Sequence, residues 1–463
     1  MRIRILITCL LAFLWNAFVQ ALPTLNYDDP YRMYTTFYPT QILNMQCKEY
    51  LKSGEMYNND RFFFSISTFA NKATYARNEN KDVVRLGNVH GALGMIPLMY
   101  GSVPTGATQP PLLTTAATKT FANPPLVGVS IANPTYADPH HKFGFFSAPL
   151  KYQKAGLRFQ ISVRPFSDIV VTLQGGVADL RQTITGLDDQ TSVAIAADVY
   201  PINAGITANQ FATDQTTVEN FLMEPSKQIF DQLGVYTGGT QKTGTEDVSV
   251  QIMWRHNFPV NRDADPEDWA YFIFTPYLQI GGIFGAAKKK DPDKLFDLCL
   301  GNNGHNALQI SGGMDFDFTE TIDIVWEAGI THFFEKNYLT RVPTHDLQFM
   351  LFPYKTTIHS SPGNTWYISF GMYAYQFLSK LSVYAQYMYL NHLSDTITLV
   401  TPDTAFKPDR LEEDTFFKVQ IANLGFNYDI SPNFSLGLGL QLPLARRAAY
   451  KTQVILLNAS LTF

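Results

Sequence analysis

Cysteine is scarce in this chain, which has three among 463 residues, at Cys9, Cys47 and Cys299. An exported protein of this length with so few cysteines is not a disulfide scaffold. The adjacent His140 and His141 have no cysteine or carboxylate at metal-ligand spacing, which argues against a metal site there. We therefore expect neither a metal nor any other cofactor.

Charge is also sparse. Charged residues make up 16% of the chain, against about 25% in ordinary soluble domains. The net charge is −5 and the isoelectric point is about 6.0, so nucleic acid is not expected as a partner. Aromatic residues nevertheless reach 14%, while the mean hydropathy is −0.07. A chain whose strands have one apolar and one polar face combines these properties.

Long apolar runs are missing outside the amino terminus. There, Arg2 and Arg4 precede an apolar run over residues 5–19, and a small-residue cleavage motif ends at Ala21. This order is typical of a secretory signal peptide. The alternative, a membrane anchor, needs ~20 apolar residues, and this run is shorter. We expect residues 1–21 to be a signal peptide that is cleaved near Ala21.

Segments with alternating apolar and polar residues recur from residue 61 to the last residue. In one of them, Leu157 and Phe159 alternate with Arg158 and Gln160. A period of two predicts a strand with one apolar and one polar face. Most segments are near the ~9–11 residues that a tilted membrane-spanning strand needs. We expect a dozen strands, in residues 61–70, 156–166, 168–177, 247–256, 269–282, 308–318, 321–331, 365–377, 381–390, 416–428, 434–442 and 450–463.

Short and long connections alternate between these segments. The short ones include residues 165–168, 319–320, 379–380 and 429–433, and the long ones are residues 77–154, 181–245, 285–306, 335–363 and 393–414. An even number of strands places both chain ends on the side of the short turns. Residues 217–234 have apolar residues at helical spacing, so we expect a short helix in that loop, either packed on the barrel rim or folded into its mouth. Residues 39–54 are a second candidate for a short helix.

These features together resemble bacterial outer-membrane β-barrel proteins of the porin and small-channel kind. In that family, an aromatic last residue with apolar residues at alternate positions is recognised by the barrel-assembly machinery. Phe463, Leu461, Ala459 and Leu457 match this assembly signal. The resemblance covers residues 61–463 and does not indicate a subfamily. A soluble β-sandwich, the alternative fold, would not predict the alternation of the loops.

The resemblance implies an all-β fold, a transmembrane antiparallel up-and-down β-barrel of about twelve strands with long extracellular loops. It implies a location in the bacterial outer membrane, with membrane lipids and the assembly machinery as partners. Residues 22–60 would form an amino-terminal segment in the periplasm or in the lumen, and residues 61–463 the barrel. A homo-oligomer is left open.

Charged residues on the polar faces would line the lumen. Acidic residues come from two neighbouring strands and basic residues from three others, which would set a transverse field across a pore. The alternative is a set of buried ion pairs that fill a narrow lumen. The expected pore-lining residues are Arg158, Arg164, Arg255, Asp315, Asp317, Asp323, Glu327 and Lys418.

A channel for passive diffusion of small polar or charged solutes is the function that this pattern favours. The main alternative is a non-conducting adhesin or structural barrel that acts through its long outer loops. A barrel lipase would need a serine beside a lipid-facing histidine, but His332 would neighbour Leu308, and the serines nearby, such as Ser369, would face inward. We expect no enzyme activity.

Cys47 and Cys299 are expected to remain free thiols. The first would lie on the periplasmic side and the second in an outer loop, separated by ~25–30 Å of hydrocarbon. A disulfide needs Cα atoms within about 7 Å. The pair could meet only if residues 22–60 thread through the lumen or if the loop of residues 285–306 folds into it.

Overall fold

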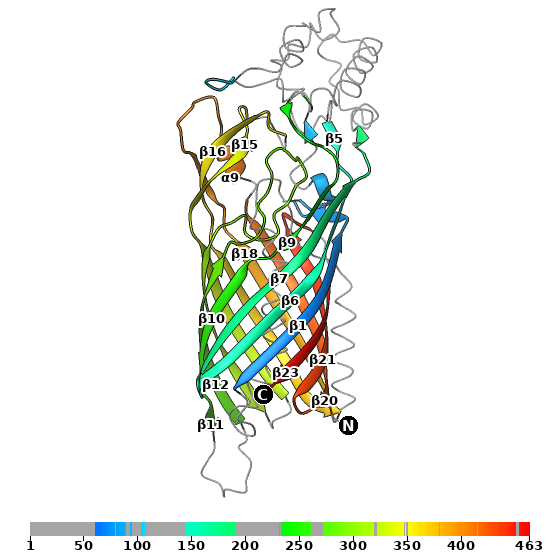
Figure 1. Ribbon diagram of the computed structural model, residues 1–463, viewed down its shortest axis with the longest axis vertical. Coiled ribbons are helices and arrows are strands. Elements are labelled where there is room, and N and C mark those ends of the chain that lie inside the picture. Colours follow the sequence, from blue (N-terminus) through cyan, green and yellow to red (C-terminus); the bar gives the residue numbers. More distant parts are fainter. Residues whose placement is uncertain are drawn as a thin grey trace, which may run out of the picture.

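The computed structural model describes residues 61–78, 80–88, 93–94, 103–107, 145–186, 188–189, 231, 233–260, 272–318, 322–346, 348, 351–378, 380–413, 415–450 and 453–463. Most of these residues lie in strands, and the long strands close into one antiparallel barrel (Figure 1). No helix in this part of the chain is long and apolar enough to cross a membrane.

The barrel wall has twelve strands, counting β9 and β10 as one: β1 (Phe62–Ala73), β6 (Leu150–Phe166), β7 (Ile169–Ile184), β9 (Thr240–Thr245) with β10 (Val248–Arg255), β12 (Phe272–Phe284), β13 (Ala307–Phe318), β14 (Ile322–Phe333), β17 (Thr365–Leu378), β18 (Leu381–His392), β20 (Phe417–Ser431), β21 (Phe434–Arg447) and β23 (Gln453–Thr462). Strands β9 and β10 both pair with β7 and are interrupted at Glu246 and Asp247. The pairing of β23 with β1 joins the last wall strand to the first, with Leu461 opposite Phe64, so the wall has no open edge.

The outward face of the wall is apolar. Ile252, Ile280, Ile310 and Ile330 lie opposite one another on four neighbouring strands and are 41–47% exposed, whereas Gln279, next to Ile280, is 6% exposed. A closed barrel with an apolar exterior is a form in which strands cross a membrane with every backbone group satisfied. The expected outer-membrane β-barrel architecture is therefore confirmed.

The two ends of the barrel differ. At the short-turn end, β6 turns into β7 at residues 167–168 and β20 into β21 at residues 432–433. At the long-loop end, β15 (Lys336–Val342), β16 (Tyr354–Ser361) and β19 (Thr396–Leu399) form a small sheet beside α9 (Asp409–Glu412), as Figure 1 shows. This sheet and helix enclose an apolar cluster of Val342, Phe352, Ile358, Ile397, Phe406 and Leu411.

Smaller elements complete the described chain. They are β2 (Tyr75–Arg77), β3 (Val83–Arg85) and β22 (Ala449–Tyr450) in one sheet, β4 (Leu93–Gly94), β5 (Phe145–Ser147) and β8 (Asp188–Asp189) in another, the 3-10 turn η2 (Leu86–Asn88), and β11 (Phe258–Val260), which extends the pairing of β12. All twelve segments expected to form strands do so. The signal peptide, residues 22–60 and nearly all of the helix expected in residues 217–234 lie outside the described residues.

Candidate functional site in the lumen

A belt of polar side chains lines the middle of the lumen. These residues are buried, and many hydrogen-bond to side chains on the neighbouring strand. Serine, glutamine and asparagine predominate, and their hydroxyl and amide groups can bind water and polar solutes. The bonds between strands join Ser67 to Asn458 at 2.9 Å, Gln174 to Gln160 at 3.2 Å, Ser249 to Gln174 at 3.3 Å, Gln386 to Ser369 at 3.1 Å and Asn423 to Gln386 at 2.9 Å.

Tyrosines narrow the lumen by lying across glycines of the adjacent strand. A Cβ atom built on Gly313 would lie 2.6 Å from the ring of Tyr277, and one on Gly329 would lie 2.6 Å from the ring of Tyr367. Both phenols donate hydrogen bonds to Glu327, Tyr277 at 2.7 Å. The predicted lumen residue Glu327 is therefore held between two tyrosines.

Five other predicted charges gather inside the short-turn end. Asp315, Asp323, Arg164 and Arg255 are each at most 6% exposed, and Asp317 is half-buried. Asp317 lies directly opposite Asp323, as the strand register predicts. The acids belong to β13 and β14 and the arginines to β6 and β10, so acidic and basic side chains occupy different parts of the wall.

Arg158 is engaged in a buried ion pair. Its guanidinium donates to both carboxylate oxygens of Glu246, at 2.6 and 3.0 Å, and the ammonium of Lys154 lies 2.7 Å from the same carboxylate. The Arg158 guanidinium also stacks 3.9 Å above the ring of Phe69. Glu246 was not predicted, because it lies at the break between β9 and β10, where the alternation is interrupted.

The loop of residues 285–306, hereafter the inward loop, is bound to the inner wall beside this ion pair. Asp247 accepts hydrogen bonds from the backbone amides of Ala287, at 3.0 Å, and Asn302, at 2.6 Å. Lys154 donates to the carbonyl of Leu300 at 3.1 Å. Because Lys154 faces the lumen and is fully buried, these contacts place the inward loop within the long-loop end of the barrel.

Lys242, an inward-facing residue of β9, adds a second attachment. Its ammonium lies 2.6 Å from the Asp297 carboxylate and 2.8 Å from the carbonyl of Leu298. Phe296 and Leu300 of the inward loop are completely buried. The polar contacts of Asp247, Lys154 and Lys242, hereafter the clasp, therefore attach the inward loop to the wall. Buried apolar side chains of the loop add to this attachment.

Cys299 lies in the inward loop and its thiol is buried. Burial raises the pKa of this thiol to about 12, so it is protonated at neutral pH. His305 in the same loop is also buried, and burial lowers the pKa of its imidazole to about 4. Cys47 lies outside the described residues, so the expected absence of a Cys47–Cys299 disulfide stays a prediction.

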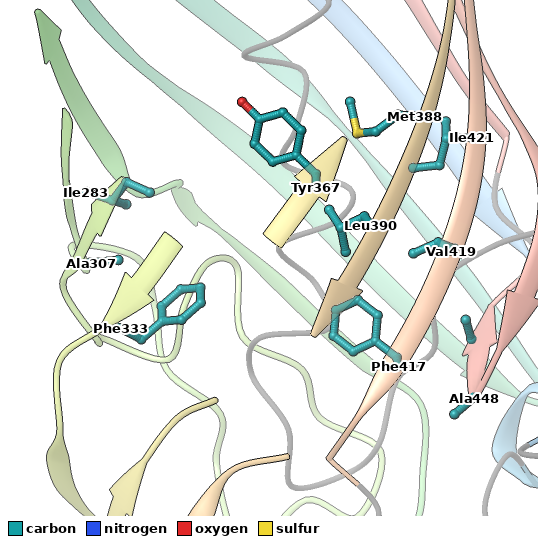
Figure 2. Packing of buried hydrophobic residues seen from close by; sticks show 11 residues of the cluster. Ile283, Ala307, Phe333, Tyr367, Met388, Leu390, Phe417, Val419, Ile421 and Ala448 are labelled. Carbon is teal, nitrogen blue, oxygen red and sulfur yellow. The ribbon is translucent and has the colours of Figure 1, made fainter. Parts of the chain in front are cut away.

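An apolar cluster occupies the long-loop half of the lumen, where the sequence predicts a polar wall. Its side chains come from several strands, as Figure 2 shows, and each is at most 5% exposed. Apolar contacts of this kind close a lumen to water more effectively than a polar wall does. This inner apolar cluster consists of Ile283, Ala307, Phe333, Tyr367, Met388, Leu390, Phe417, Val419, Ile421, Ala448 and Ala449.

The inner apolar cluster explains why Lys418 does not face the lumen. Local alternation suggested that Phe417 and Val419 meet lipid and Lys418 meets the lumen. In the structure Phe417 and Val419 are 1% exposed inside the barrel, and Lys418 is exposed on the outer side. The same alternation of inward and outward side chains holds further along β20, where Asn423 faces inward and Phe426 faces outward.

Arg446 is an inward-facing charge that the sequence pattern misses. Strict alternation along β21 would place it on the lipid face with Leu436 and Leu442. A bulge at Leu444 intervenes, because Gln420 pairs with Ala445 while the next residue, Ile421, pairs with Pro443. The bulge rotates Arg446 inward. Pro443 is the one local signal of this irregularity.

His332 lies opposite Leu308, as expected, and accepts or donates a hydrogen bond with Asn364 at 2.9 Å. Ser369 faces inward, is 2% exposed and bonds to Gln386. Within the described ranges, no group of three or more His, Cys, Asp or Glu residues could hold a metal ion.

The chain end lies at the short-turn rim. Phe463 is 56% exposed and its ring stacks on Phe62 at 5.2 Å. Leu461 and Leu457 are 36% and 58% exposed on the outward face, and Ala459 is half-buried between them. The residues expected to form the assembly signal therefore present one outward apolar stripe.

Among solved structures, the chain is similar to outer-membrane barrels at low sequence identity. No protein-family profile and no curated protein matches the chain. An outer membrane channel of Pseudomonas putida F1 has a TM-score of 0.44 and 8% identity, covering 87% of this chain and 96% of that one. The translocator domain of autotransporter NalP from Neisseria meningitidis has a TM-score of 0.33 and 7% identity, covering 93% of this chain and 98% of that one. A Pseudomonas aeruginosa FadL homologue has a TM-score of 0.32 and 9% identity, covering 88% of this chain and 91% of that one. The fold described above rests on the strand register and not on these similarities.

Proposed function

We propose that this protein is a bacterial outer-membrane channel for passive diffusion of small polar or charged solutes. The observation that supports it is the lumen wall, with a belt of hydrogen-bonding side chains and separate acidic and basic groups inside an apolar exterior. Such a wall has little use in a barrel that only anchors loops, since apolar packing would stabilise it at least as well. The short-turn end would face the periplasm.

Solute passage requires the inward loop to move. In the described conformation the inward loop and the inner apolar cluster occupy the long-loop half of the lumen. The inward loop is held to the wall by Asp247, Lys154 and Lys242, and to the outer loops by Arg341 and Lys355, which both contact Asp293. Displacement of the loop from these contacts would give solutes access to the polar belt.

Delivery to the membrane would follow the expected route. Residues 1–21 would be removed near Ala21, and the outward stripe that ends at Phe463 would be recognised by the assembly machinery. Deleting Phe463 should then lower the amount of barrel in the outer membrane more than its stability in detergent.

The second candidate is a non-conducting surface protein. The closed long-loop half and the three-stranded sheet β15–β16–β19 outside the barrel favour it.

Ion selectivity discriminates between the two functions. In planar bilayers, neutralising Asp315, Asp317 and Asp323 to asparagine should shift the reversal potential away from cations, while Asp179→Asn, an exposed residue on the outer side of β7, should not. Absence of any conductance from a folded barrel favours the surface protein.

A further inference from the structure

Arg446 is a buried arginine with an unusual environment. It lies on the lumen side of β21 opposite Val419, and it is 4% exposed. All three nitrogens of its guanidinium group are buried and have no hydrogen-bond partner in the structure. A buried guanidinium without acceptors is strongly unfavourable, because the charge has lost its hydration without compensation.

Two other buried arginines of this chain have hydrogen-bond acceptors. Arg158 has the Glu246 carboxylate on two of its nitrogens. Arg341 donates to backbone carbonyls, among them those of Leu233 at 2.9 Å and Pro353 at 2.9 Å, and to Asp293 at 3.0 Å. Arg158 and Arg341 thus have acceptors for their guanidinium groups, whereas none of the three guanidinium nitrogens of Arg446 has one in the structure.

A second arginine increases the positive potential at this place. Arg77, on β2, is brought close by the pairing of β2 with β22, in which Arg77 lies opposite Ala449. The amide of Ala448 also donates to the carbonyl of Asn78 at 3.2 Å. Arg77 is near enough for the two positive charges to interact.

We infer that Arg446, with Arg77, forms a binding site for a small oxyanion, such as phosphate or a carboxylate, inside the long-loop end of the lumen. Guanidinium groups bind oxyanions through paired, charge-assisted hydrogen bonds, and low local polarity strengthens them. The neighbouring inner apolar cluster supplies that low polarity. This inference rests on the proposed channel function in assigning the anion to solutes that enter the lumen.

The inward orientation of Arg446 selects a free solute over a lipid headgroup. A lipid phosphate would be bound from the outer face, where Lys418 and Arg447 are exposed and lie opposite each other. Arg447 is therefore a matched control: it is the next residue of the same strand, with the same charge, pointing the other way. Its guanidinium lies 5.0 Å from the ring of Phe416.

The test is thermal unfolding of the folded barrel in detergent micelles, with inorganic phosphate compared with chloride at equal ionic strength. Phosphate should raise the melting temperature of the wild type and of Arg447→Gln in a saturable manner. Arg446→Gln should unfold at a higher temperature than the wild type without phosphate, and should bind phosphate roughly ten- to a hundredfold more weakly. Arg446→Lys, which keeps the charge, should show an intermediate response.

Two results would overturn the site. One is a wild-type melting temperature that phosphate does not change, and the other is an equal phosphate response in Arg446→Gln or Arg446→Lys. Loss of the response in Arg447→Gln alone, together with binding to vesicles that carry phosphatidic acid, would instead indicate a lipid headgroup outside the barrel. Since this assay needs no ion current, a barrel that binds phosphate but never conducts would refute the channel and leave the anion site standing.

Discussion

At the scale of single residues, burial of charge distinguishes structural groups from functional ones. Glu246 is 1% exposed and neutralises two buried cations, Lys154 and Arg158. The exposed pair of Asp179 and Arg181 is separated by 3.8 Å and is largely hydrated. Formal charge is similar in the two cases, but the dielectric environment differs, and the cost of removing a partner differs with it.

Glu246→Gln should therefore be strongly destabilising. It leaves two buried cations without a carboxylate, and we expect a loss of about 3–5 kcal/mol in the free energy of unfolding. Asp179→Asn should cost less than about 1 kcal/mol. Urea titration of the barrel in lipid vesicles measures both, and equal costs would show that Glu246 is hydrated and not buried.

The outward face allows a second residue-scale prediction. Ile310 is 41% exposed in the row of isoleucines on the barrel wall, and Leu339 is 50% exposed on β15, outside the barrel. Ile310→Arg should destabilise by ~2–4 kcal/mol if that row lies near the membrane midplane. Leu339→Arg should be nearly neutral in the same vesicle assay. Similar values for both would contradict the assignment of the lipid-facing surface.

At the scale of elements, tyrosines packed on glycines join neighbouring strands. The ring of Tyr367 fills the space above Gly329, so a larger residue there must displace it. Gly329→Val should cost about 1–3 kcal/mol through overpacking. The double variant Tyr367→Ala, Gly329→Val should be more stable than the sum of its single changes, as a double-mutant cycle would show. Strict additivity would mean that the ring does not occupy this space.

The inward loop should respond to pH through His305. Burial lowers the pKa of His305 to about 4 from an ordinary value of 6.5. The unfolded loop therefore takes up a proton first as the pH falls, and the stability present above pH 6.5 is lost between about 6.5 and 4, by up to about 3 kcal/mol. The protection factors of amides in residues 285–306, which correct hydrogen exchange for its intrinsic dependence on pH, should be lower at pH 5 than at pH 8. His305→Gln should remove most of this difference, and a pH dependence unchanged by it would rule out His305 as its cause.

At the scale of the whole molecule, the barrel could be predicted because one simple rule applies along its length. Lipid outside and polar groups inside impose a period of two, and this rule located all twelve wall strands. It fails where the environment changes, as at Lys418 and Arg446 in the long-loop half, where the lumen is apolar and a bulge shifts the phase. The inward loop could not be predicted either, because its attachments at Asp247 and Lys242 depend on contacts between segments distant in sequence.

In the proposed function, this barrel is a channel that the inward loop closes at one end. Single-channel recording in planar bilayers tests this on the wild type and on Asp247→Ala with Lys242→Ala, which removes two of the three clasp side chains on residues 285–306. The control is Glu413→Gln, a substitution at an exposed rim residue whose ion pair is with Arg410. We expect the clasp variant to conduct in more frequent or larger steps than the wild type and the control. A folded clasp variant that conducts no more than the wild type would contradict the claim.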